Sequence, residues 1–131
     1  MLRECDLRPR LSKSRKPSEL LSAMSDWLGE FEQLVLFAVL RREPDAYGVT
    51  VREEIEARAG RAVSAGAVYT TLERLEERGL LASAWGDPTP ERGGKRKRYF
   101  RLQPAGRAAL DRSWQAVRAM ARGASQKLSH P

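Results

Sequence analysis

The sequence predicts a mainly α-helical fold with one small β-hairpin. Apolar residues recur at helical spacing through most of residues 27–128, and two short runs between residues 81 and 102 have the composition of strands. The chain has 131 residues, of which 41% are hydrophobic and 31% charged. That length and mix are typical of one compact domain with extensions.

The chain divides into three predicted parts. Residues 1–23 are basic, contain Pro9 and Pro17, and show little periodicity, so we expect a mostly disordered extension. Two interpretations of this extension stay open, a basic arm that touches phosphate and a loose tail. Residues 24–103 are predicted to form the working domain, and residues 104–128 a C-terminal dimerisation helix.

A helix is predicted over residues 27–41, with Ser25 or Asp26 as its N-cap. It is apolar nearly all round, so it must be buried on nearly all sides. In a domain this small, we expect part of that burial to come from a second subunit, through Leu34 and Phe37.

A second helix, capped by Asp45, is predicted over residues 46–58 and ends at Gly60. A third begins after Ser64, a good N-cap, and stops at Gly79. Two short helices joined by a tight connection that contains glycine make a helix-turn-helix, whose second member is the recognition helix.

The predicted recognition helix has two different faces. Its apolar stripe is formed by Val68, Leu72 and Leu75. The opposite face is small, polar and basic, and consists of Gly66, Ala67, Thr70 and Arg74. A face without bulky side chains can enter a DNA major groove of roughly 12 Å and reach base edges. An ordinary amphipathic surface helix is the alternative.

A β-hairpin is predicted from residues 81–85 and 97–102, which flank a turn-forming segment. Its tip and return strand carry five cations: Arg92, Lys95, Arg96, Lys97 and Arg98. Of the net charge of +7, residues 91–101 supply +5 and residues 1–23 supply +3. Charge concentrated in this way indicates a polyanionic partner, although a solvated loop is the alternative. A helix-turn-helix followed by a basic hairpin is a winged helix.

The last helix is predicted to start at Gln103-Pro104, because proline suits the first helical position. Its apolar residues alternate in steps of four and three over nearly three heptads: Leu110, Trp114, Val117, Ala121, Ala124 and Leu128. Such a seam favours packing between subunits, and packing against the parent domain is the alternative. Trp114 is also the candidate for binding a flat apolar effector in a cleft of the dimer, and simple packing against its mate in the other subunit is the alternative.

Several classes of protein are excluded by what the sequence lacks. Its only histidine, His130, argues against a zinc site or a Ser-His-Asp triad, and no phosphate-binding glycine loop occurs, so we expect no enzyme, metal or cofactor. Its only cysteine, Cys5, excludes an internal disulfide. The longest apolar run, Leu34 to Leu40, is too short to span a bilayer, and no secretory signal is visible. We therefore expect a cytoplasmic protein.

From about Leu28 to Gly123 the chain resembles the PadR-like transcriptional regulators, in the shorter form with one helix after the wing. The matching stretches are Ala46-Tyr47-Gly48, Ser64-Ala65-Gly66-Ala67-Val68-Tyr69, Thr71-Leu72-Glu73-Arg74-Leu75-Glu76-Glu77-Arg78-Gly79-Leu80, Gly93-Gly94 and Tyr99-Phe100-Arg101-Leu102. The resemblance implies a homodimeric winged helix that represses bacterial promoters and is often released by a small molecule. It also implies that Tyr69 and the wing cations meet the DNA backbone.

Two functions follow as hypotheses, a sequence-specific DNA-binding regulator and a winged helix that binds protein without DNA. For the first, the predicted DNA-binding residues are Ser64, Gly66, Ala67, Tyr69, Thr70, Arg74, Arg92, Lys95, Arg96 and Lys97. The predicted dimerisation residues are Leu34, Phe37, Leu110, Trp114, Val117 and Ala121. Thr70 and Arg74 are expected to point toward bases.

Overall fold

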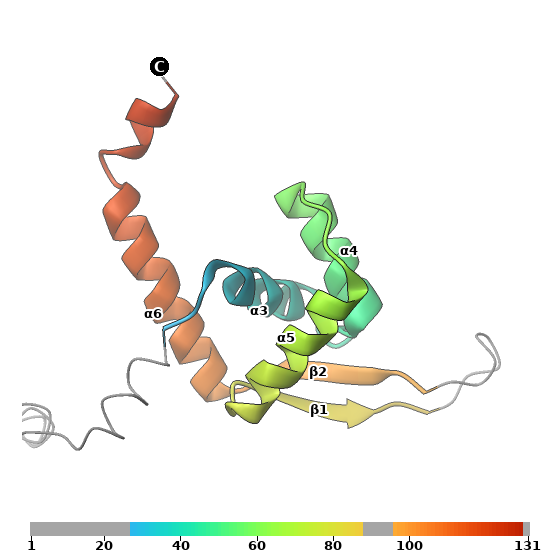
Figure 1. Ribbon diagram of the computed structural model, residues 1–131. Helices are drawn as coiled ribbons and strands as arrows, with labels where there is room; N and C mark the ends of the chain where they lie inside the picture. Colours follow the sequence, from blue (N-terminus) through green and yellow to red (C-terminus); the bar gives the residue numbers. More distant parts are fainter. Residues whose placement is uncertain (1–26, 88–95, 130–131) are drawn as a thin grey trace, which may run out of the picture.

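The computed structural model describes residues 27–87 and 96–129. The elements are α3 (Glu30–Arg42), α4 (Gly48–Ala59), α5 (Ala65–Glu77), β1 (Leu81–Trp85), β2 (Arg98–Leu102), α6 (Pro104–Ala121) and the 3-10 turn η2 (Ser125–Leu128). Figure 1 shows α3 between α6 on one side and α4 with α5 on the other, and the hairpin below α5. The fold is mainly helical with one two-stranded sheet, as the sequence predicts.

The central helix of the core is α3, which contacts α4, α5, α6 and β2. Val35, Leu36 and Val39 are fully buried. Much of the all-round apolar character of this helix is therefore explained by burial within one protomer. Leu34 and Phe37, the two residues predicted to meet a second subunit, are half-buried and pack against the edge of the core.

The first two helices begin later than the sequence indicates. The first starts at Glu30 rather than at residue 27, and the Gly29 amide donates to Glu32 Oε1 at 2.9 Å. Residues 27–29 lie outside the helix, where the Leu28 amide donates a hydrogen bond to Ser113 Oγ of α6 at 3.1 Å. The predicted caps Ser25 and Asp26 lie outside the described residues.

The start of α4 is set by tertiary pairing rather than by the predicted cap, Asp45. Ala46 is fully buried, and its carbonyl accepts from the Phe100 amide at 2.8 Å, so this residue is hydrogen-bonded to β2 and lies outside the helix. Thr50 supplies the capping hydroxyl: it accepts from the Tyr47 amide at 3.0 Å and donates to the Asp45 carbonyl at 2.7 Å. Asp45 therefore contributes its backbone and not its carboxylate.

The remaining predicted helix signals of the helix-turn-helix are confirmed. Gly60 ends α4 at φ +67°, in the left-handed region that favours glycine. Ser64 caps α5, because its Oγ accepts from the Ala67 amide at 3.0 Å. Gly79 takes φ +79° just after α5 and turns the chain into β1.

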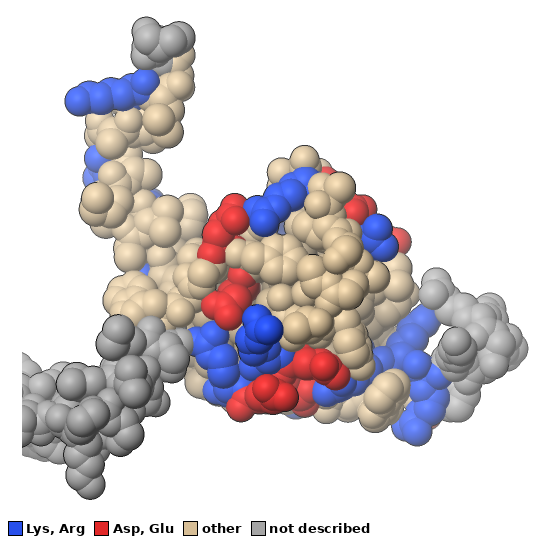
Figure 2. All heavy atoms as spheres, viewed as in Figure 1, with Lys and Arg blue, Asp and Glu red and all other residues tan. Residues whose placement is uncertain are grey.

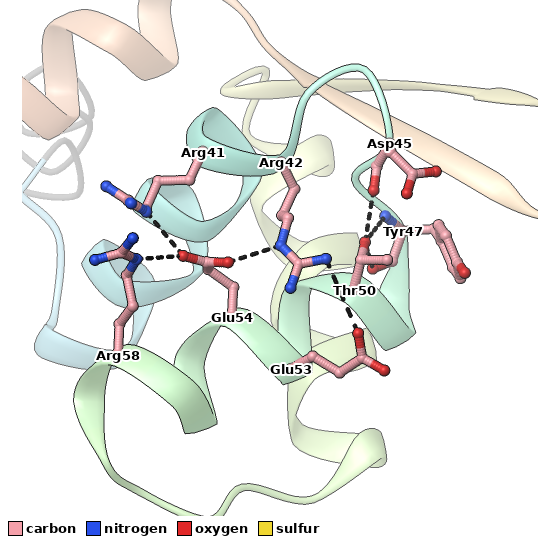
Figure 3. A network of polar contacts seen from close by, with 8 residues as sticks. All are labelled: Arg41, Arg42, Asp45, Tyr47, Thr50, Glu53, Glu54 and Arg58. Atoms are coloured by element: carbon pink, nitrogen blue, oxygen red, sulfur yellow. Dashed lines mark hydrogen bonds and ion pairs between the residues drawn. The ribbon is translucent and has the colours of Figure 1, made fainter.

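A cluster of charged side chains joins α3 to α4 (Figure 3). Glu54 on α4 accepts from Arg41 Nε at 2.8 Å and from Arg42 Nε at 2.7 Å, both on α3. Arg58, one turn further along α4, donates to the same carboxylate at 2.7 Å. These hydrogen bonds, led by Arg42, lower the pKa of Glu54 from 4.5 to about 2. We call Glu54 with Arg41, Arg42 and Arg58 the Glu54 cluster.

The hairpin pairs β1 and β2 antiparallel, from Leu81 opposite Leu102 to Trp85 opposite Arg98. The second strand begins at Arg98, one residue later than predicted. The predicted alternation is confirmed in its central residue, because Phe100 is buried and its neighbours on the other face are not.

The last helix begins with Pro104 at its first turn, as predicted. At Gly106 it packs closely against the residue that precedes β1, because a Cβ there would lie 2.1 Å from the Leu80 carbonyl oxygen. It ends at Ala121, and Gly123 takes φ +80°. The predicted seam of nearly three heptads is therefore wrong in its last part, because Ala124 and Leu128 lie beyond the α-helix. Within residues 27–87 and 96–129, no helix is long and apolar enough to cross a membrane.

Candidate nucleic-acid interface

The recognition helix α5 presents one bare face to solvent. Val68, Leu72 and Leu75 are fully buried against the core, which fixes the rotation of the helix. The opposite face is exposed along its whole length and consists of Gly66, Ala67, Thr70 and Arg74. This arrangement confirms the two faces that the sequence predicts. Ser64, at the head of the face, is also exposed, and its hydroxyl is engaged as the helix cap.

Tyr69 lies on the flank of α5 that faces the wing, and 42% of it is exposed. Its hydroxyl oxygen accepts a hydrogen bond from Arg98 Nη1 at 3.2 Å. A phenol can accept and donate at the same time. Because Arg98 occupies the acceptor side, the hydroxyl proton is available to an outside acceptor such as a phosphate oxygen.

Among the described residues, two cations lie at the open end of the wing. Arg96 is exposed, donates from Nε to the Gly86 carbonyl at 3.0 Å, and lies over the Trp85 ring at 5.8 Å. Lys97 Nζ lies 4.9 Å from the centre of the Tyr47 ring, at the start of α4. Both cations therefore contact aromatic rings, which restrict the positions of the two charged groups. The other predicted wing cations, Arg92 and Lys95, lie outside the described residues.

Arg98 differs from the other wing cations. Its guanidinium pairs with Glu76 and, at 3.4 Å, with Glu73, both on α5. The sequence groups it with four cations that need an anionic partner, but its charge is already opposed by two carboxylates of the same chain. In Figure 2 red and blue atoms mix over the C-terminal part of α5, whereas blue atoms gather on the hairpin.

An open groove of about 780 Å³ joins these parts. It is lined by Tyr47, Gly48, Val49, Tyr69, Trp85, Arg96, Lys97 and Arg98, which come from α4, α5 and both sides of the wing. Tyr47, Val49 and Trp85 are not among the predicted site residues. Tyr47 had a usable signal, because it belongs to the Ala46-Tyr47-Gly48 stretch that carries the family resemblance. Trp85 and Val49 had none, because only the folded chain brings them beside Tyr69.

The predicted dimerisation residues fall into two groups. Leu110 is only 4% exposed and belongs to the core of its own protomer, so its predicted role at a subunit interface does not fit its position. Trp114 and Val117 are 41% and 51% exposed, and Ala121 is half-buried. Trp114 meets Phe37 edge-to-face, with ring centres 6.1 Å apart. The exposed apolar side chains of α6 continue to Met120, which is 80% exposed.

The fold and this surface define a winged helix-turn-helix whose recognition helix and wing face the same groove. Residues 36–112 match the transcriptional regulator PadR-like family. The chain belongs to this family, and it is a DNA-binding transcriptional regulator and not an enzyme. A single α-helix follows the hairpin within residues 96–129, which fits the shorter subclass.

Individual relatives agree with this assignment. The transcriptional regulator Rv3488 of Mycobacterium tuberculosis is 38% identical over 86 residues, which cover 66% of this chain and 76% of that protein. A PadR family regulator from Clostridium difficile has the same fold, with a TM-score of 0.62 at 22% identity, covering 76% of this chain and 99% of that one. Bacillus subtilis PadR, solved in complex with operator DNA, gives a TM-score of 0.53 at 15% identity, covering 63% of this chain and 45% of that one.

Proposed function

We propose that this protein represses transcription by binding an inverted-repeat operator as a homodimer in the cytoplasm. The observation that carries the proposal is the bare, exposed face of α5, flanked by Tyr69 and by the braced cations of the wing. Such a helix fits a major groove while the flanking groups reach the backbone. The complex of Bacillus subtilis PadR with operator DNA supports the choice of partner.

The interface divides into two kinds of contact. Tyr69, Arg96 and Lys97 meet phosphates, and Arg92 and Lys95 are proposed to extend this set along the wing. Thr70 and Arg74 face base edges, and the backbone at Gly66 and Ala67 allows the helix to approach closely. Ser64 caps the start of α5, which lies at the opening of the DNA major groove. Phosphate contacts fix position and base contacts supply sequence preference.

The test is binding to a duplex taken from immediately upstream of the protein's own gene. Lys97→Ala should weaken binding to all sequences and lower the slope of log affinity against log salt by about one. Arg74→Ala should cost roughly 1–3 kcal/mol at one position of the operator. A protein-protein module without a DNA role is the alternative, and it predicts no shift of this duplex at low salt.

We also propose that α6, with the edge of α3, forms the dimer. The support is the exposed apolar side chains of Trp114, Val117 and Met120 beside the half-buried Phe37. Light scattering on the double variant Trp114→Glu, Val117→Glu should show a monomer or unfolded protein. A folded dimer of unchanged stability contradicts this part of the proposal.

The same helix offers a site for a small aromatic or apolar effector. Trp114 is partly exposed, and its indole face can stack on a flat ligand. Binding there should quench tryptophan fluorescence in the wild type, and less so in Trp114→Phe, which retains Trp27 and Trp85. Equal quenching in both proteins contradicts this location.

A further inference from the structure

Arg98 sits where the recognition helix meets the wing and contacts both. On α5 it pairs with Glu73 and Glu76 and donates to the Tyr69 hydroxyl. These three positions are spaced by four and three residues, so they line one flank of the helix. On β1, Arg98 Nε donates to Ser83 Oγ at 3.0 Å, and that hydroxyl donates to Glu76 Oε2 at 2.7 Å.

The aromatic neighbours extend this arrangement to the open end of the wing. The Arg98 guanidinium lies 6.0 Å from the centre of the Trp85 ring, and the Arg96 guanidinium lies 5.8 Å from the same ring. The Arg98 guanidinium also lies 5.1 Å from the centre of the Phe100 ring, which is buried in the core. The Trp85 ring, whose residue lies opposite Arg98 in the hairpin, is therefore close to both guanidinium groups.

The positive charge of Arg98 is paired with carboxylates of the same chain. Partial burial acts to lower its pKa, but the hydrogen bond to Tyr69 and the charge of Glu76 outweigh burial, so the pKa lies above its ordinary value. Without this cation, Glu73 and Glu76 would stand unopposed at the edge of the groove. Glu73 is nearly half exposed there. Two such carboxylates would repel an approaching DNA strand.

We infer that Arg98 is a positioning residue for DNA binding rather than a phosphate ligand. It holds the wing at a fixed angle to α5, directs the Tyr69 hydroxyl proton outward, and offsets part of the negative charge of the two glutamates. This inference rests on the proposed DNA-binding function. A planar guanidinium is required, because one lysine ammonium cannot serve Ser83, Tyr69 and two carboxylates in a fixed geometry.

The experiment compares Arg98→Lys with Arg98→Gln in binding the upstream duplex across a range of salt concentrations. Both variants should lose roughly tenfold or more in affinity, the effect of losing a charge-assisted hydrogen bond. Arg101→Gln is the matched control, because Arg101 is exposed on the other face of the same strand. It removes the same charge and should change affinity far less.

The opposite result is equally clear. If Arg98 binds phosphate, lysine replaces it well, so Arg98→Lys keeps wild-type affinity while Arg98→Gln lowers the salt slope by about one. That outcome overturns the inference. So does Arg98→Lys protein that melts earlier yet, once folded, binds as the wild type does.

Two further measurements keep the test decisive. If Arg98→Gln does not fold, Ser83→Ala removes one partner without changing any charge, and it should weaken binding several-fold although Ser83 lies outside the residues that line the groove. Unchanged affinity in Ser83→Ala and Arg98→Lys together overturns the inference. If the wild type itself binds no DNA at low salt, the proposed function fails, and this result is distinct from any difference among the variants.

Discussion

Two clusters in this protein use the same chemistry with the charges reversed. In the Glu54 cluster, one carboxylate accepts from three arginines and ties α3 to α4. At the junction of α5 and the wing, one guanidinium serves Glu73, Glu76, Tyr69 and Ser83. Each cluster is a single charged group that bridges two elements through several partners.

The difference lies in what each cluster connects. The Glu54 cluster joins two helices of the scaffold, and the groove beside the wing includes none of its members. Arg98 joins the two elements that form the groove, and it lines that groove itself. The first cluster should therefore affect stability with little effect on the DNA affinity of folded protein. The second should affect affinity more than stability.

The largest expected loss of stability comes from a substitution in the hydrophobic core, and it is the reference for the cluster variants. Leu72 is fully buried on α5. Leu72→Ala should cost roughly 2–5 kcal/mol in the free energy of unfolding, because it removes buried apolar contacts and leaves a cavity. Urea denaturation measures this loss. If a variant in either cluster loses as much free energy of unfolding as Leu72→Ala, the clusters contribute more to stability than we propose.

The next effect is the loss of the Glu54 cluster. Glu54→Gln should lower the melting temperature by less than Leu72→Ala does, and leave DNA affinity at 25 °C unchanged. Glu53→Gln is the matched control on the same helix, because Glu53 is exposed and its only ion pair among the described residues spans 3.9 Å. A loss of affinity in Glu54→Gln would remove the distinction between the two clusters.

The pH dependence of Glu54 sharpens this prediction. The folded pKa of about 2 lies below the ordinary value of 4.5, so the stabilisation is complete above the higher value. It is lost as the pH falls toward the lower value. The difference in melting temperature between wild type and Glu54→Gln should therefore be largest near neutral pH and shrink below about pH 4.5. A difference that does not change with pH contradicts the assignment to this carboxylate.

The smallest expected effect on stability is that of Gly66→Ala, which should raise stability while it lowers DNA affinity. Gly66 lies in the first turn of α5, and a Cβ there would meet nothing within 4 Å. Gly66→Ala should raise stability by up to about 1 kcal/mol, because alanine favours the helix. The added methyl lies on the face proposed to enter the groove, so operator affinity should fall. Thermal melting and DNA titration of the same preparation test both parts.

The sequence predicts the parts of this fold that depend on local signals. Ser64, Gly60 and Gly79 set the limits of helices through hydrogen bonds and backbone angles that involve near neighbours. It predicts less well where a distant residue intervenes. The start of α4 depends on Phe100, and the start of α3 depends on Ser113.

The candidate site shows the same division. The bare face of α5 follows from helical periodicity, and the sequence places it correctly. Arg98 looks like one more wing cation until the fold brings Glu73 and Glu76 beside it. Leu110 fits the heptad seam but faces its own core. A count of charges or apolar residues cannot reveal partners that are distant along the chain.

In the proposed complex, the two recognition helices of a two-fold dimer enter successive major grooves. Hydroxyl-radical footprinting on the upstream duplex tests this arrangement, with wild type compared to the double variant Arg96→Ala, Lys97→Ala. Two protected segments with centres about ten base pairs apart, or a multiple of that, are expected for the wild type. The variant should lose protection at the outer edges and keep the centre, because the wings lie over the flanking backbone. A single asymmetric footprint, or loss confined to the centre, would contradict the account.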